Sequence, residues 1–150
     1  MEVHRLRLDV CTISEVKKKG NGTTKYNNYI LIYSGKERKE KDKSGVGLLI
    51  HKKYEQQIKN IAYINDRLIH ATLEIQKKQI DIVSVYAPDI SKPKVEREEF
   101  YNQLDVLLNT IPRENKLILA KDFNAKTIRF STGLRKDLMK THQMKMVNFF

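Results

Sequence analysis

The chain has 150 residues, 40% of them hydrophobic, which is enough for one folded domain with a real core and excludes a disordered protein. Lys and Arg outnumber Asp and Glu by 29 to 18, and the net charge of +11 favours an anionic partner such as nucleic acid over a merely solvated surface. No apolar run is long enough to span a membrane, and the N-terminal residues lack the apolar core of a secretory signal, so we expect no membrane partner. The single cysteine, Cys11, excludes an internal disulfide and favours an intracellular protein of the nucleus or cytoplasm.

Three short apolar runs in the first third of the chain predict buried strands: residues 10–14 (VCTIS), 29–33 (YILIY) and 45–50 (GVGLLI). The polar stretches between these runs, rich in Lys and Gly, predict loops at residues 17–25 and 35–45. Residues 1–7 have the spacing of the tail of a helix.

The middle of the chain predicts an antiparallel hairpin. Residues 68–75 (LIHATLEI) alternate between apolar and polar, as expected of a strand with one buried face. After the short turn QKKQ, residues 80–86 (IDIVSVY) are apolar on both faces, so this second strand should be central and covered on both sides.

A helix is expected after the hairpin. Ser91 and Pro93 suit its start, and Pro112 suits its end. Its buried stripe should consist of Phe100, Leu104, Leu107, Leu108 and Ile111. Another buried strand follows at residues 117–120 (LILA), and helical spacing returns from about Leu134 onward.

This order of elements predicts a fold class. Strands dominate, helices are few and at least one hairpin is present. We therefore expect a single α/β (α+β) domain with mixed, mostly antiparallel sheets rather than a regular succession of βαβ units.

Three of the predicted strands carry a polar group at their carboxyl ends: Glu15, Tyr86 and Asp122. Each has an ordinary explanation by itself, as a solvated loop residue, a rim aromatic and a turn-forming aspartate respectively. A turn does not explain why Phe123 follows Asp122 directly. Because ligands in layered α/β folds gather at strand ends, the three groups taken together indicate a ligand site.

The motifs ISEV, GVGLLI, DRLIHATL, VSVYAP, the FYNQL helix, the IP turn and LILAKDFNAKT occur here in the order of one known domain. The chain resembles the endonuclease/exonuclease/phosphatase superfamily. More narrowly, it is similar to the apurinic-endonuclease-like domain of non-LTR retrotransposons and to the related craniofacial-development-protein-like copies. The resemblance covers residues 8 to about 127. It implies a four-layered α/β sandwich that hydrolyses DNA phosphodiesters with Mg²⁺ or Mn²⁺ and no small-molecule cofactor.

The resemblance also implies residue roles. Glu15 would bind the metal ion, and Asp122 would orient and deprotonate the attacking water. Tyr86 would donate its hydroxyl to the phosphate, and Asn124 would hydrogen-bond the phosphate or fix Asp122. Phe123 would point back into the core between Asp122 and Asn124, since neighbouring residues of a strand face opposite ways.

Basic residues near these positions are candidates for contact with DNA. Lys17, Lys18 and Lys19 begin two residues after Glu15 and are placed to bind substrate. Lys121 stands where the family normally has glycine; it is either a phosphate-binding cation or a mark of a decayed site, and we favour decay because it adds bulk where the site needs room. Arg67 resembles a family position, and we expect it to brace the sheet rather than bind substrate. The histidines lack metal-ligand spacing, so no zinc site is expected.

The chain departs from the family at both ends. It begins after the family's first strand, which ends in a metal-binding asparagine, and it stops before a further aspartate and a closing histidine. Residues 1–150 are therefore expected to be a partial domain with weak or no catalysis by itself. Two other functions stay open: a non-catalytic basic remnant that binds nucleic acid or a protein, and a phosphatase of the same superfamily. The charge of +11 and the DFNA motif argue against the phosphatase.

Overall fold

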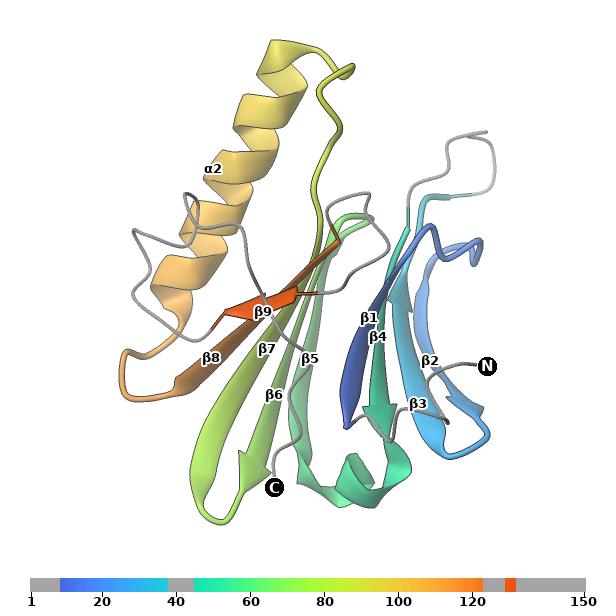
Figure 1. The fold of residues 1–150 in the computed structure, drawn as a ribbon, viewed down its shortest axis with the longest axis vertical. Coiled ribbons are helices and arrows are strands. Elements are labelled where there is room, and N and C mark those ends of the chain that lie inside the picture. The colour runs from blue at the N-terminus through green and yellow to red at the C-terminus, as the bar shows by residue number, and fades with distance from the viewer. Residues whose placement is uncertain (1–8, 38–44, 123–128, 132–150) are drawn as a thin grey trace.

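A computed structural model describes residues 9–37, 45–122 and 129–131, with side chains as far as Ala120. One sheet contains, in spatial order, β1 (Val10–Ser14), β4 (Val46–His51), β3 (Tyr29–Ser34) and β2 (Asn21–Tyr26), all antiparallel. The other contains β5 (Ile58–Asn65), β6 (Leu68–Ile75), β7 (Lys78–Tyr86), β8 (Lys116–Asp122) and β9 (Arg129–Ser131). Two helical elements complete the described part: the 3₁₀ helix η1 (Lys52–Gln57) and the α-helix α2 (Lys94–Thr110) (Figure 1).

The predicted fold class is confirmed: the described chain is an α+β protein with two mostly antiparallel sheets and few helices. The predicted strands at residues 10–14 and 68–75 coincide with β1 and β6. The other predicted strands and the helix agree with the structure to within two residues at each end. β6 and β7 form the expected antiparallel hairpin, and β7 lies inside its sheet between β6 and β8.

Two strands show where sequence patterns fail. The predicted loop at residues 17–25 is wrong, because β2 occupies most of its second half and pairs with β3 along its whole length. β5 was not expected at all; its residues are half-buried or exposed and follow no strict alternation. Both are edge strands, which a neighbouring strand holds through main-chain hydrogen bonds, so neither needs a continuous apolar face.

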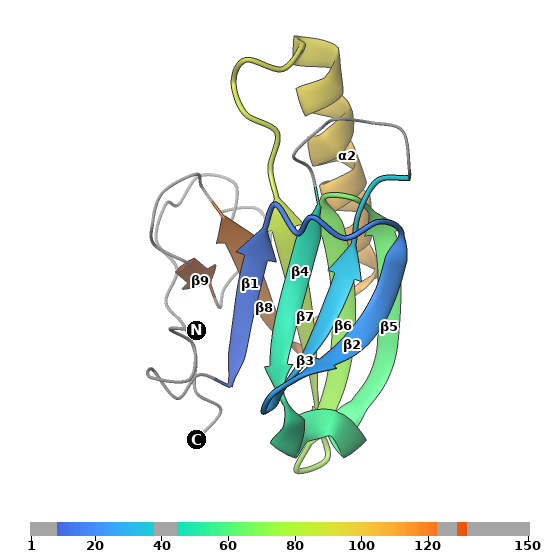
Figure 2. The ribbon, with the colours of Figure 1, turned by 90° about the vertical axis from the view of Figure 1, so that its right-hand side faces the viewer.

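The two sheets face one another across a common core (Figure 2). β1 lies against β8 and β7, and β4 lies against β7 and β6. The outer face of the β5–β9 sheet is covered by α2, whose buried residues are Phe100, Leu104, Leu107 and Leu108, as predicted. The described residues thus supply three layers. The fourth layer of the expected sandwich stays a prediction.

The molecule has two distinct ends. At the end drawn uppermost in Figure 1, β1, β3, β7 and β8 reach their carboxyl termini. We call this the upper end. At the opposite, lower end lie η1 and the tight β6–β7 turn, in which Gln76 and Lys77 both have positive φ. Among the described residues, no helix is long and apolar enough to cross a membrane.

Candidate functional site

Strand register brings two of the predicted site residues together at the upper end. β7 and β8 are parallel, and their last register pair joins Tyr86 to Asp122. β1, on the facing sheet, runs the same way and ends at Ser14, immediately before Glu15. Residues from three strands and two sheets therefore lie at the same end of the molecule, as the carboxyl ends of strands do in many ligand sites.

Buried hydroxyl groups connect the two sheets near this end. The hydroxyls of Thr12 in β1 and Ser84 in β7 are hydrogen-bonded to each other. Both hydroxyl oxygens also lie within hydrogen-bonding distance of the Gly47 carbonyl oxygen, at 3.2 and 3.1 Å. Because each hydroxyl has one proton, one of them donates to the other, which in turn donates to this carbonyl. A second connection runs from the Ser34 hydroxyl to the carbonyl of Asn65, at 2.7 Å. Because a buried hydroxyl without a partner is costly, these bonds define how the sheets align.

Glu15 lies in a sharply bent turn that two glycines make possible. Its φ is +54°, a left-handed conformation that is uncommon for a glutamate. The next residue, Val16, folds back onto the sheet, and its amide donates to the carbonyl of Gly45 at 3.2 Å. A Cβ on Gly45 (φ +135°) would lie 2.5 Å from the Val16 carbonyl oxygen, and one on Gly47 would lie 2.7 Å from Val16 Cγ2. The GVG sequence at the start of β4, of which Gly45 precedes the strand, thus makes room for the turn that leaves Glu15 exposed.

Tyr86 is held by Arg67, which belongs to the β5–β6 turn. The Tyr86 amide donates to the carbonyl of Arg67 at 2.9 Å, and Arg67 Nη1 donates to the Tyr86 carbonyl at 3.2 Å. The guanidinium carbon of Arg67 also lies 5.1 Å from the centre of the Tyr86 ring, a cation–π distance. These contacts agree with the expectation that Arg67 braces the sheet.

The three lysines after Glu15 are all exposed. The ammonium group of Lys18 lies 5.0 Å from the centre of the Tyr33 ring, on the neighbouring strand β3. Lys17 and Lys19 are solvent-facing side chains of the same loop. Their place beside Glu15 suits contact with an anionic ligand, and that role stays a prediction.

Other predicted site residues are placed only in part or not at all. Asn124 and Phe123 lie outside the described residues, as do residues 1–7 and the helical spacing from Leu134 onward. Lys121 is placed through its main chain, as the register partner of Val85 and Arg129. Among the described side chains, no group of three or more His, Cys, Asp or Glu residues could hold a metal ion.

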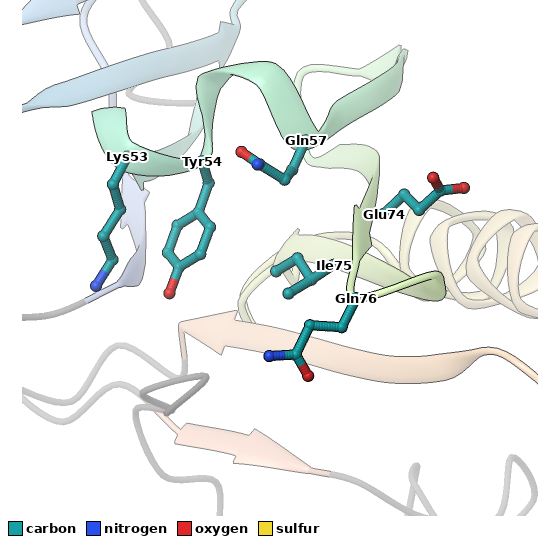
Figure 3. A pocket seen from close by; sticks show the side chains of 6 residues that line it. All are labelled: Lys53, Tyr54, Gln57, Glu74, Ile75 and Gln76. Atoms are coloured by element: carbon teal, nitrogen blue, oxygen red, sulfur yellow. The ribbon is translucent and has the colours of Figure 1, made fainter.

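A pocket at the lower end of the described residues is a second candidate site. It has a volume of about 360 Å³ and lies between η1 and the β6–β7 turn (Figure 3). Its one lysine, Lys53, is bonded at 2.6 Å to the buried carboxylate of Asp9. The hydrogen bond with Asp9 raises the pKa of the Lys53 ammonium, which therefore stays charged at neutral pH. A permanently charged, already paired lysine is a poor acid or base, so this pocket offers little chemistry.

The most buried charged cluster is also structural. The Asp81 carboxylate, 2% exposed, accepts from Thr72 Oγ1 at 2.8 Å and from Asn115 Nδ2 at 2.8 Å. His70 Nε2 lies 2.7 Å from the same carboxylate. These bonds join β6, β7 and the α2–β8 loop, and they satisfy the carboxylate from within the fold.

Sequence reasoning missed the residues that support the site. Thr12 and Ser84 read as ordinary small residues of apolar strands, and the glycines of GVG read as part of a strand start. The available signal was chemical: two hydroxyl residues interrupt strands that are otherwise apolar. Such a residue needs a buried partner, although the pattern does not say which one.

The fold and its upper end thus define an α+β protein whose strand ends converge on one candidate site. No family model matches the chain. Craniofacial development protein 2 of Bos taurus is 28% identical over 145 residues, covering 91% of this chain and 24% of that protein. Craniofacial development protein 2 of Tragulus javanicus is 27% identical over 145 residues, covering 91% of this chain and 25% of that protein. The chain spans about a quarter of the length of these curated relatives.

Proposed function

We propose that this chain is a metal-dependent DNA endonuclease domain of retrotransposon origin, which hydrolyses phosphodiesters by attack of water. The observation that supports this most directly is that Glu15 and the Tyr86–Asp122 register pair, which come from different sheets, lie at the same end of the molecule. A carboxylate, a phenol and a second carboxylate are the groups that such a reaction needs. The proposal implies a DNA partner and action in the nucleus or cytoplasm.

The residues fit a magnesium ion better than a metal that needs a protein cage. Glu15 is an exposed carboxylate at a strand end, and no cluster of three ligands surrounds it among the described side chains. Mg²⁺ keeps most of its waters and binds through one or two carboxylates together with substrate phosphates. When bound, the ion would polarise the scissile phosphate and stabilise the leaving oxygen.

The chain's own groups would carry the remaining steps. Asp122 would orient the attacking water and accept its proton. The Tyr86 hydroxyl would donate a hydrogen bond to a phosphate oxygen, where negative charge increases in the transition state. Asn124 would donate its amide to the phosphate or fix Asp122. The net charge of +11, with Lys17 to Lys19 beside Glu15, would attract the DNA backbone.

A second function is favoured by one observation. Lys121, at a position where the resemblance implies glycine, directly precedes Asp122 and has Val85 as its register partner inside the sheet. A chain with these features could bind DNA without cutting it. Binding that weakens with salt would not separate the two functions, because any basic protein shows it.

Nicking of supercoiled plasmid with Mg²⁺ tests the proposal. The wild type is compared with Glu15→Ala and Asp122→Ala, and with Glu98→Ala and Asp105→Ala as matched controls. Both control residues are exposed on α2. We expect weak nicking that requires Mg²⁺, falls about a hundredfold or more in each site variant and is unchanged in the controls. Nicking that is absent, or equal in all five proteins, would contradict the proposal and leave DNA binding as the function.

A further inference from the structure

The Arg67 side chain contacts Tyr86 at two different places. Its guanidinium donates to the Tyr86 carbonyl at 3.2 Å and also lies over the face of the Tyr86 ring, 5.1 Å from the centre. The main chains are joined as well, by the bond from the Tyr86 amide to the Arg67 carbonyl. One side chain therefore restrains both the backbone and the ring of the same tyrosine.

The turn that carries Arg67 is itself anchored on three sides. The Arg67 amide donates to Asn65 Oδ1 at 2.8 Å, which fixes the turn locally. Asn65 Nδ2 donates to Gln103 of α2 at 2.8 Å. The Asn65 carbonyl accepts from the buried Ser34 hydroxyl of the facing sheet at 2.7 Å. The position of Arg67 is thus set by both sheets and the helix together.

We propose that Arg67 is a positioning residue, which fixes the ring of Tyr86 and thereby places its hydroxyl for the reaction. The inference rests on the proposed function and deepens it. Arginine is suited to this task because its planar guanidinium can stack on a ring while its N–H groups bond a carbonyl. A lysine at this position could keep the charge but not both contacts at once. An unrestrained tyrosine would lose rate, since small misplacements of a contributing group are costly in catalysis.

A double-mutant cycle on Mg²⁺-dependent nicking tests this inference. The variants are Arg67→Ala, Arg67→Lys, Tyr86→Phe and the two Arg67 substitutions combined with Tyr86→Phe. Tyr86→Phe keeps the ring and removes only the hydroxyl. Arg113→Ala, in an exposed loop, is the matched control for loss of one positive charge. Because Arg67→Ala could weaken folding, thermal unfolding is measured for each protein, and Arg67→Lys serves as the milder change.

We expect kcat to fall about tenfold in both Arg67 variants, while KM for DNA changes less than about twofold. In the Tyr86→Phe background the same substitutions should have no further effect on kcat, because the hydroxyl that they misplace is gone. An equal fall in kcat in both backgrounds, or an effect confined to KM, would overturn the inference and indicate that Arg67 contacts the phosphate directly.

A second measurement does not depend on activity. The aromatic NMR signals of Tyr86 are identified by their loss in Tyr86→Phe and then followed in Arg67→Lys and Arg113→Ala. We expect them to shift or broaden only in Arg67→Lys, because the ring loses its cation partner. If the wild type does not nick, the proposed function fails, and unchanged Tyr86 signals in Arg67→Lys would overturn the positioning contact as well. If the wild type nicks normally but the cycle is additive, the inference fails alone.

Discussion

The two ends of the molecule are held together by different kinds of interaction. The lower end is closed by η1, whose Tyr54 ring is 4% exposed, and by an ion pair between Lys53 and Asp9. The upper end is joined by buried hydroxyls, such as the Thr12–Ser84 pair, and it holds Glu15 in a left-handed turn. A buried aromatic ring contributes about 3 to 5 kcal/mol to stability, whereas a hydrogen bond contributes about 1. The lower end therefore contributes more to the stability of the fold, and the upper end fixes the relative positions of the two sheets and of Glu15.

This difference has a physical reason. Apolar contacts are strong but non-directional, so they do not specify where one group lies relative to another. Hydrogen bonds are weaker in net terms, but they are directional and leave a cost when broken. A site whose groups come from different sheets needs the second kind of interaction. Substitutions at the two ends should therefore separate loss of stability from loss of activity.

The largest effect should come from the lower end. Tyr54→Ala leaves a cavity beneath η1, and we expect it to lower the free energy of unfolding by about 3 to 5 kcal/mol. Nicking per folded molecule should stay as in the wild type. Urea unfolding and nicking measure the two quantities. Tyr26→Ala, at a ring that is 49% exposed, is the control and should change stability by less than about 0.5 kcal/mol. Loss of nicking by folded Tyr54→Ala would show that the lower end also affects activity, so that the two ends do not separate stability from activity.

Gly45→Ala, at the upper end, should lower both the stability of the protein and its nicking activity. It forces a Cβ to within 2.5 Å of the Val16 carbonyl oxygen at a φ of +135°, and we expect about 2 kcal/mol of destabilisation. Because Val16 follows Glu15, Mg²⁺-dependent nicking should fall about tenfold as well. Gly20→Ala is the control, since that glycine also has positive φ but no atom near its Cβ position. Equal nicking in the two variants would show that the Glu15 turn does not depend on this close approach.

The pH dependence of the free energy of unfolding tests the effect of burial on a single group, the Cys11 thiol. Burial raises the pKa of the Cys11 thiol from 9.0 to about 11. Between these values the unfolded chain loses the proton and the folded chain keeps it, so stability falls as pH rises from about 9 to 11. We expect about 2 kcal/mol of this loss by about pH 10.5. Urea unfolding at about pH 8 and pH 10.5 should show a steeper fall in the wild type than in Cys11→Ala. The tyrosines titrate in both proteins, and the pKa of Tyr29, raised chiefly by burial, is raised further by the Cys11 charge, which adds to the difference. An equal fall in stability in the two proteins would contradict a raised pKa of the Cys11 thiol.

The smallest expected change in stability is at the bond between the sheets. Ser84→Ala removes one hydroxyl, and Thr12 still donates to the Gly47 carbonyl, so we expect a loss of about 1 kcal/mol. Nicking should nevertheless fall by about threefold or more, because β1 and β7 lose their direct connection. Ser91→Ala, at an exposed loop residue, is the matched control. A loss of stability with unchanged nicking would mean that the hydroxyls serve the core rather than the site.

Much of the fold could be predicted because its central strands are apolar runs. β1, β6 and β7 are visible in the sequence through composition and alternation, and α2 through its buried stripe. β2 and β5 could not be predicted in this way, because an edge strand is held by its neighbour's main chain. The candidate residues Glu15, Tyr86 and Asp122 were recognised from their order along the chain. The structure describes Glu15 and Tyr86 with their side chains and Asp122 only through its strand position.

The sequence by itself determined which apolar segments are strands, which of them end on a polar group, and that the chain carries a strong positive charge. These are local properties, set by side-chain chemistry and spacing. Only the tertiary structure decided that Tyr86 pairs with Asp122, that Thr12 bonds to Ser84 across 72 residues of chain, and that Arg67 holds Tyr86. Contacts of this kind depend on register and on the alignment of two sheets. Those are fixed by many weak interactions acting together, and no single stretch of sequence contains them.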